Sequence, residues 1–218
     1  MSAFLDALTR VPALLASHVL LSAAALLLGI AISLPLGIWS ARNATVARVS
    51  LGFASLVQTI PSLALLALFY PVLLSLSALV GGGIPALGFL PSLIALTLYA
   101  LLPIMRNTVT GLAEVPQGLR QAGTALGMTS AQRMRLVQLP IAMPTLLAGV
   151  RTATTIAIGT ATIAAFIGAG GFGERIVTGL ALNDRQLLLA GALPAAAHAL
   201  VSELLFEAID RLLLHRPG

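Results

Sequence analysis

The sequence contains no cysteine and no lysine. The lack of cysteine excludes disulfides, thiolate metal sites and cysteine nucleophiles. The lack of lysine excludes a P-loop, because the lysine of that motif contacts the nucleotide phosphates. The sequence also lacks a cluster of His, Asp or Glu that would mark an active site, so we expect no enzyme activity and no bound cofactor in this chain.

Charged residues are also scarce: they make up 9% of the 218 residues, while 58% are hydrophobic. A soluble domain averages about 25% charged residues, and a chain this apolar has too little polar surface to cover its core in water. We therefore predict an all-α integral membrane protein, folded as a single domain over 1–218. Its basic residues are all arginines scattered between long neutral stretches, which is not the pattern of a nucleic-acid-binding surface.

The uncharged stretches divide the chain into about five membrane-spanning helices, with a sixth left open. A span needs about 20 mainly apolar residues. The stretch between Arg48 and Arg106 must turn back once, because a single helix over it would measure about 85 Å, and the glycines at 81–83 mark the turn. We predict spans at 14–40, 51–79, 92–105, 144–168 and 186–206, of which the third could begin as early as Ile84.

The distribution of arginine predicts the orientation, because cytoplasmic segments of membrane proteins are enriched in Lys and Arg. With the N-terminus outside, the outer segments hold only Arg10, Arg175 and Arg185. The inner segments then hold the other arginines, at positions 42, 48, 106, 120, 133, 135, 151, 211 and 216. We therefore expect the polar segment 106–140 and the C-terminus to face the cytoplasm.

This polar segment carries a spaced motif: Gln121-Ala122-Gly123, three residues, Gly127, nine residues, and Val137-Gln138-Leu139-Pro140. It resembles the EAA signature of bacterial ABC importer permeases. Gln121 stands where that family usually has Glu, and Gly123 where it has Ala, so the size at 121 is kept but the charge is lost. Apart from the resemblance, we expect a short helix that ends near Gly127 and presents small residues to a partner surface. From spacing alone, an ordinary cytoplasmic loop containing such a helix remains an alternative.

The resemblance implies a coupling loop at about 106–140 that docks in a cleft of an ATPase subunit. The residues it assigns to this role are Gln121, Ala122, Gly123, Gly127, Met128, Thr129, Leu139 and Pro140. It further implies a type I ABC importer permease-like fold in the bacterial inner membrane. The expected partners are two ATPase subunits, which bind ATP and Mg²⁺, a second permease copy or paralogue, and an extracytoplasmic solute-binding protein.

Three segments, 98–108, 149–153 and 159–173, resemble the osmoprotectant subfamily of these permeases. That resemblance implies transport of glycine betaine, choline or carnitine. An ion-gradient-driven secondary transporter is an alternative, although such proteins usually carry ionisable residues inside the membrane. A permease for another substrate, such as an amino acid, is a second alternative.

Candidate pathway or gate residues are the two tyrosines and three glycines of a turn, namely Tyr70, Tyr99, Gly168, Gly170 and Gly171. Quaternary ammonium groups are usually held by aromatic cages, and two tyrosines make a poor cage, so we expect specificity to reside in the binding protein. The glycines formally begin a G-x-G-x-x-G pattern, but they follow an apolar span rather than a strand, which favours an extracytoplasmic turn over a nucleotide site.

Five further ionisable residues lie in the first span and in or at the cytoplasmic end of the fifth. For His18 and His198 we expect a hydrogen bond between helices, with a proton relay as the alternative. Glu203, Glu207 and Asp210 share one helix face. We expect them to pair with nearby arginines, with contact to the ATPase or a gate as the alternative.

Overall fold

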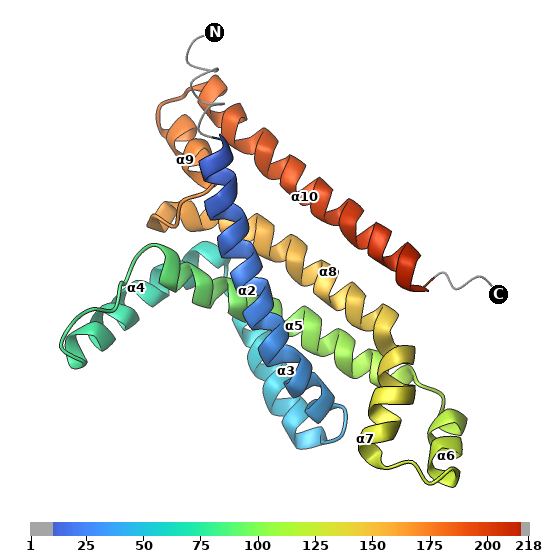
Figure 1. Ribbon diagram of the computed structural model, residues 1–218. Helices are drawn as coiled ribbons and strands as arrows, with labels where there is room; N and C mark the ends of the chain where they lie inside the picture. Colours follow the sequence, from blue (N-terminus) through green and yellow to red (C-terminus); the bar gives the residue numbers. More distant parts are fainter. Residues whose placement is uncertain (1–10, 215–218) are drawn as a thin grey trace.

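The computed structural model describes residues 11–214, and all regular elements in this range are helical (Figure 1). The α-helices are α2 (Val11–Ser40), α3 (Ala44–Thr59), α4 (Ser62–Leu79), α5 (Phe89–Glu114), α6 (Gln117–Ala125), α7 (Ser130–Arg133), α8 (Leu139–Ile163), α9 (Gly173–Ala181) and α10 (Arg185–Leu214). A π-helical segment, Met134–Gln138, joins α7 to α8, and a 3₁₀ turn, Ala164–Ile167, follows α8. Five stretches are long and apolar enough to cross a membrane: α2, α4, α5, the run Ser130–Ile167, and α10. This confirms the all-α class and the predicted number of spans, five, among the described residues.

The predicted second span, 51–79, is wrong as a single helix, because the chain breaks at Ile60 and Pro61 into α3 and α4. Proline cannot donate a backbone hydrogen bond and forces the preceding residue out of helical geometry. Ile60 accordingly adopts extended backbone angles, with φ −75° and ψ 126°. The hydroxyl of Tyr99 on α5 donates a hydrogen bond to the Ile60 carbonyl, so the break is held from the neighbouring helix.

The boundaries of the other predicted segments also change. The third span is longer than 92–105, since α5 runs through Arg106 to Glu114, and the polar segment therefore leaves the helix only at Val115. The fourth span is continuous with that segment through the π-helical residues. The polar stretch before the fifth span contains a short helix, α9, and the fifth span itself extends to Leu214.

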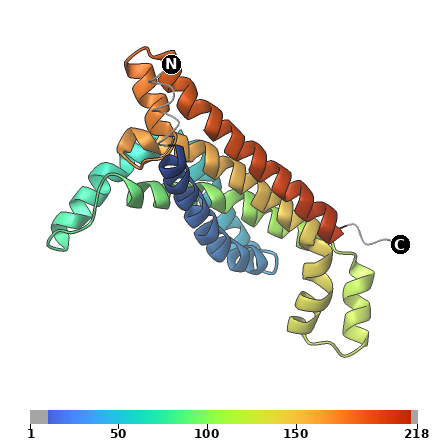
Figure 2. The same ribbon diagram turned by 45° about the horizontal axis from the view of Figure 1, so that its top comes forward.

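The centre of the fold is α5, which packs most extensively against α8 and α2 (Figure 2). Small residues allow this close approach, as is common between membrane helices. A Cβ atom added to Gly29 on α2 would lie 2.7 Å from the Ala100 Cβ of α5, and one added to Gly149 on α8 would lie 2.7 Å from the Asn107 Cβ. These glycines are therefore required by the spacing between the helices.

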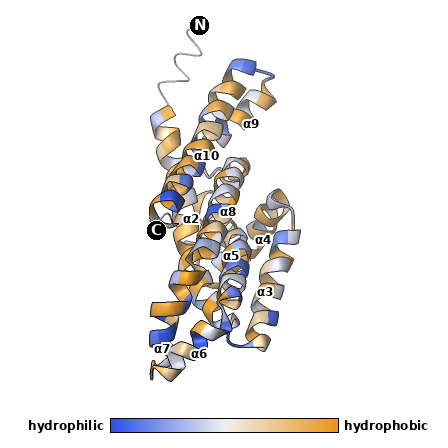
Figure 3. Ribbon diagram, turned by 90° about the vertical axis from the view of Figure 1, so that its right-hand side faces the viewer, coloured by the Kyte–Doolittle hydropathy of each residue, from blue (hydrophilic) through white to orange (hydrophobic). Residues whose placement is uncertain are grey.

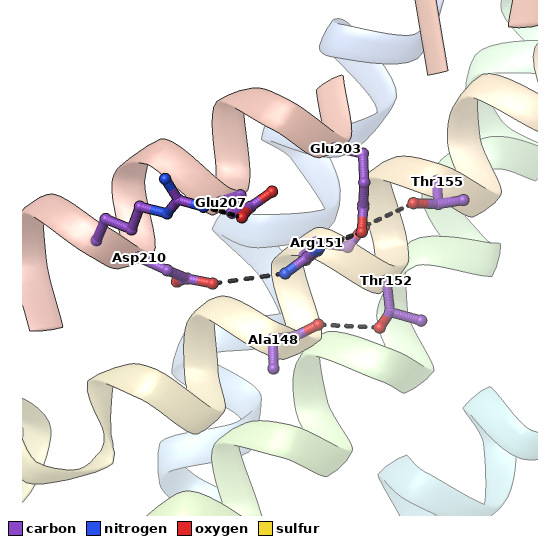
Figure 4. Close-up of polar contacts among 8 residues, drawn as sticks. Ala148, Arg151, Thr152, Thr155, Glu203, Glu207 and Asp210 are labelled. Atoms are coloured by element: carbon purple, nitrogen blue, oxygen red, sulfur yellow. Dashed lines mark hydrogen bonds and ion pairs between the residues drawn. The ribbon is translucent and has the colours of Figure 1, made fainter. Parts of the chain in front are cut away.

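Helix α10 lies along the outside of α8 and is tied to it by ion pairs (Figure 4). The Arg151 guanidinium donates from Nε to a Glu203 oxygen at 2.9 Å, and its Nη1 lies 3.5 Å from an Asp210 oxygen. Glu207 pairs with Arg211 on α10 itself. The expected pairing of the acidic face with arginines is confirmed.

The hydrogen bond to a neighbouring helix that we expect for His18 is wrong, and none is found for the Nδ1 atom of His198 in residues 11–214. The two rings lie edge to face with their centroids 5.4 Å apart. Both His18 nitrogens and the His198 Nδ1 atom are buried without a hydrogen-bond partner in the part of the chain that the structure describes. Contact between the rings, together with the packing of His18 on Phe172 at 5.2 Å, replaces the hydrogen bond.

Candidate functional site

The spaced motif from Gln121 to Gln138 lies on a helical hairpin that projects from the bundle beyond the end of α5, and its last two residues, Leu139 and Pro140, begin α8 (Figure 1). We call residues 115–138 the polar hairpin. Pro116 begins its first helix, α6, and α7 with the π-helical segment forms its return. Hydrophilic residues gather at this end of the molecule and again around α9 at the opposite end, with apolar helices between them (Figure 3). The arrangement matches a membrane protein with two water-facing ends.

Helix α6 ends in a turn that requires Gly127. Gly127 has φ +75°, in the left-handed region that residues with a Cβ rarely adopt. The Gly127 N–H donates to the Thr124 carbonyl at 3.0 Å, and the Met128 N–H donates to the Gly123 carbonyl at 3.0 Å. This pair of bonds is the Schellman motif that terminates many helices, so the predicted glycine-terminated helix is confirmed.

Gly123 is buried under the side chain of Arg133. A Cβ atom at Gly123 would lie 3.2 Å from the Cγ and Cδ atoms of Arg133 and 3.4 Å from the Met128 sulfur. The Arg133 guanidinium continues across the turn and donates to the Met128 carbonyl at 3.0 Å. The absence of a side chain at position 123 therefore lets Arg133 fasten the two arms of the hairpin together.

Two further contacts fix the hairpin. The Arg120 guanidinium donates to the carbonyls of Leu112 and Ala113, which lie in the last turn of α5 and have no helical partners. Thr129 and Gln132 form a capping box at the start of α7, with side chains and backbone N–H groups bonded reciprocally. The hairpin is thus built as a stiff element attached to α5.

The hairpin exposes apolar side chains although it lies at a polar end of the molecule. Leu126, beside the Gly127 turn, is 78% exposed, and Leu136 on the return arm is 64% exposed. Ala122 is also exposed, and Gln121 lies at a hollow of about 650 Å³ between the arms. Exposed apolar groups on an otherwise polar element are typical of a surface that a partner covers.

The return arm continues into the membrane without a loop. The Leu139 N–H donates to the Met134 carbonyl, five residues back, which closes the π-helical turn. Pro140 then occupies the start of α8, where its missing N–H is tolerated. π-Helical turns are often found at functional sites. A displacement of the hairpin would therefore be passed directly to α8.

The candidate gate glycines lie at the opposite end of the bundle from the hairpin. Gly168, Gly170 and Gly171 all have positive φ and connect the 3₁₀ turn to α9. A Cβ at Gly171 would lie 2.9 Å from the His18 Nδ1 atom, so this glycine lets the turn close over α2. The Gly88 N–H donates to the Ile167 carbonyl at 2.7 Å and ties the α4–α5 connection to the same turn.

The two tyrosines are not brought together. Tyr70 is 43% exposed on α4, whereas Tyr99 is 6% exposed and bonded to Ile60. Their role in a pathway stays a prediction. Residues 11–214 contain no group of His, Cys, Asp and Glu that could hold a metal ion.

Sequence reasoning missed the structural roles of Arg120 and Arg133. It used both only as positive charges that set the orientation. The position of Arg120, shortly after the Val115-Pro116 step that ends α5, could have indicated a side chain folding back onto open carbonyls.

Comparison with known proteins gives consistent matches. Residues 33–216 match the family of binding-protein-dependent transport system inner membrane components. The chain is 44% identical over 193 residues to the osmoprotectant import permease protein OsmW of Salmonella typhimurium, covering 88% of this chain and 86% of that one. It is 39% identical over 194 residues to the choline transport system permease protein OpuBB of Bacillus subtilis, covering 89% and 84%. A chain of the MetNI methionine ABC transporter superposes with a TM-score of 0.81 at 22% identity, covering 94% of this chain and 97% of that one, and shows the same fold.

Proposed function

Since this chain belongs to the family of binding-protein-dependent transport system inner membrane components and is the permease subunit of an ABC importer for osmoprotectants, we propose that its cargo is a quaternary ammonium compound such as choline, glycine betaine or carnitine. The observation that carries the proposal is its similarity over nearly its whole length to permeases named for these compounds. The neighbours that transport amino acids are similar at 21–22% identity, which supports only the fold.

The composition of the chain supports recognition of the cargo by a protein other than the permease. Aromatic residues make up 5% of the sequence, and of the two tyrosines Tyr70 is exposed on α4 whereas Tyr99 is buried and bonded to Ile60. A cage for a trimethylammonium group needs several aromatic faces. Selection of the cargo therefore falls to a solute-binding protein outside the membrane, and the permease provides the path.

The polar hairpin is the docking element for the ATPase. Its exposed apolar residues, Ala122 and Leu126, lie beside the Gly127 turn and would enter a cleft of the partner. Gln121 contributes a neutral hydrogen-bonding group. Two permease copies, or one copy and a paralogue, would then hold two ATPase subunits, which bind ATP and Mg²⁺.

The hairpin end faces the cytoplasm in this proposal, and the start of α2 faces outward. Among described residues, the hairpin end carries arginines on the α2–α3 turn, α3 and the hairpin itself, whereas Arg175 and Arg185 lie at the α9 end. The positive-inside rule assigns the arginine-rich end to the cytoplasm.

The coupling step follows from the stiffness of the hairpin. When bound ATP closes the ATPase pair, each hairpin moves with its cleft, and the movement passes through the π-helical segment to α8. Because Gly149 of α8 is packed against α5, α5 must follow. The ATPase thereby shifts the equilibrium between two conformations of the bundle. ATP acts on this chain only through that shift.

Transport by the reconstituted complex tests the function. The permease, its ATPase and its binding protein are placed in proteoliposomes, and uptake of radiolabelled choline, glycine betaine, carnitine and methionine is measured with and without ATP. We expect ATP-dependent uptake of a quaternary ammonium compound and no methionine uptake. ATP-dependent uptake of methionine alone would contradict the proposed cargo, and uptake driven by an ion gradient without ATP would contradict the importer class.

A further inference from the structure

Beside the polar hairpin lies a second hollow, of about 470 Å³, whose lining combines three arginines from separate segments. Arg42 comes from the α2–α3 turn, Arg120 from α6 and Arg133 from α7. We call it the arginine hollow. Figure 1 shows the α2–α3 turn and the hairpin at the same end of the molecule.

None of the residues that line the arginine hollow is acidic. The nearest carboxylate along the chain, Glu114, lines the neighbouring hollow and accepts a hydrogen bond from Thr145 at 3.3 Å. The ion pairs among described residues involve only Arg151 and Arg211. Arg120 and Arg133 also line the hollow that holds Glu114, yet within residues 11–214 none of the three arginines forms an ion pair. Three like charges on one cavity repel one another, and a bound anion would relieve that repulsion.

One arginine of the lining also has a donor atom without a partner among the described residues. Nη2 of Arg120 is bonded to the end of α5, but its Nε atom is buried without a hydrogen-bond partner in the part of the chain that the structure describes. A buried donor left unpaired is costly. Arg42 is exposed, and Ser130 is a further polar residue of the lining.

We propose that the arginine hollow binds a phosphate-bearing anion. Guanidinium groups match the geometry of phosphate oxygens through paired hydrogen bonds. The lining also includes the apolar residues Leu112 and Met134, and Trp39, 56% exposed one turn before Arg42, marks the level of the membrane interface. A headgroup of an anionic phospholipid therefore fits the site better than free phosphate. Once bound, it joins the α2–α3 turn to the polar hairpin.

The test uses the intact permease–ATPase complex in neutral detergent, stripped of lipid. The midpoint of thermal unfolding of the permease is followed during titration with short-chain phosphatidylglycerol, inorganic phosphate or short-chain phosphatidylcholine at constant ionic strength. A ligand that binds the folded state raises the midpoint in proportion to its occupancy. The variant is Arg42→Gln, and the matched control is Arg48→Gln, which removes an equally exposed charge from nearby α3 outside the hollow.

We expect phosphatidylglycerol to raise the midpoint and phosphatidylcholine to leave it unchanged. Arg42→Gln should weaken the apparent affinity about tenfold, as expected for one lost charged hydrogen bond, and Arg48→Gln should leave it within about twofold. A response to phosphate equal to that of phosphatidylglycerol would identify free phosphate as the source. The proposal is overturned if neither anion acts, or if both variants weaken binding equally. It is also overturned if the anion raises the midpoint only for permease separated from the ATPase, because the hollow would then be covered by the ATPase in the complex.

Discussion

Replacing Gly149 by alanine should destabilise the permease, because this glycine lies where α8 crosses α5. The new Cβ atom would lie 2.7 Å from the Asn107 Cβ and 2.8 Å from the Pro103 carbonyl oxygen. The second contact is with backbone and cannot be relieved by rotating a side chain. Inserting a methyl group into such packing costs about 1–3 kcal/mol, which for a protein of this size lowers the unfolding midpoint by about 2–12 °C.

Gly159 provides a matched control on the same helix. A Cβ atom at Gly159 meets no atom within 4 Å, and the residue is exposed. Gly159→Ala should leave the midpoint unchanged or raise it slightly, because alanine favours helix over glycine by up to about 1 kcal/mol. Thermal unfolding of both variants in detergent, followed by fluorescence-detected size exclusion, measures the difference. Equal midpoints for the two variants would refute the packing of α8 on α5 described above.

Three further substitutions test other parts of the structure. Tyr99→Phe should lower the midpoint by about 2–4 °C, because it removes one hydrogen bond worth about 1 kcal/mol at the Ile60 break; an unchanged midpoint would contradict that bond. Gly127→Ala should reduce stability by about 1 kcal/mol because of its positive φ. Gly123→Ala should cost less, because the atoms near its new Cβ belong to the flexible side chains of Arg133 and Met128, which can shift by a few tenths of an ångström. The reverse order in thermal unfolding would contradict the hairpin geometry. Arg151→Leu should make α10 more sensitive to proteolysis, because it leaves Glu203 and Asp210 of that helix without their partner on α8. Arg211→Leu breaks only an exposed pair within α10 and should not have this effect. Similar cleavage of both variants would argue against the α8–α10 ion pairs.

The features that sequence predicted well are those set by composition and by strong local signals. Long apolar runs predicted the five spans, and Gly127 predicted the end of α6, because only glycine readily adopts the left-handed angles of that turn. The acidic face of α10 was predicted from its helical spacing and is paired with Arg151 and Arg211.

The errors arose in apolar segments, where the ends of the helices are set by contacts with other helices and not by the local sequence. The break at Pro61 is not predicted from the sequence, because the residues on both sides of it are as apolar as those of a continuous span. The hydroxyl that donates to the Ile60 carbonyl at the break belongs to Tyr99, which lies far away in sequence. The extension of α5 past Arg106 was missed, because one charge was taken as a membrane boundary although nothing in the backbone stops the helix before Val115.

The candidate site was predicted as a set of residues but not as a structure. The spacing of the motif located Gln121, Gly123 and Gly127 on one element. It could not show that Arg133 lies over Gly123, or that Arg42 from a different turn approaches the same hairpin, because both depend on how the segments pack.

Binding of the ATPase to α6 is the central claim, and one substitution tests it directly. Ala122→Arg places a bulky charged side chain on the exposed face of α6 without straining the backbone. Gly127→Arg would strain it, because Gly127 has a positive φ. Ala181→Arg makes the same change on an exposed alanine of α9 at the opposite end of the bundle. Each variant is purified with a tag on the permease, and the amount of ATPase retained and its rate of ATP hydrolysis are measured. We predict that the folded Ala122→Arg variant loses at least about tenfold in both, while Ala181→Arg matches the unmodified complex. Retention of a fully active ATPase by Ala122→Arg would contradict the account.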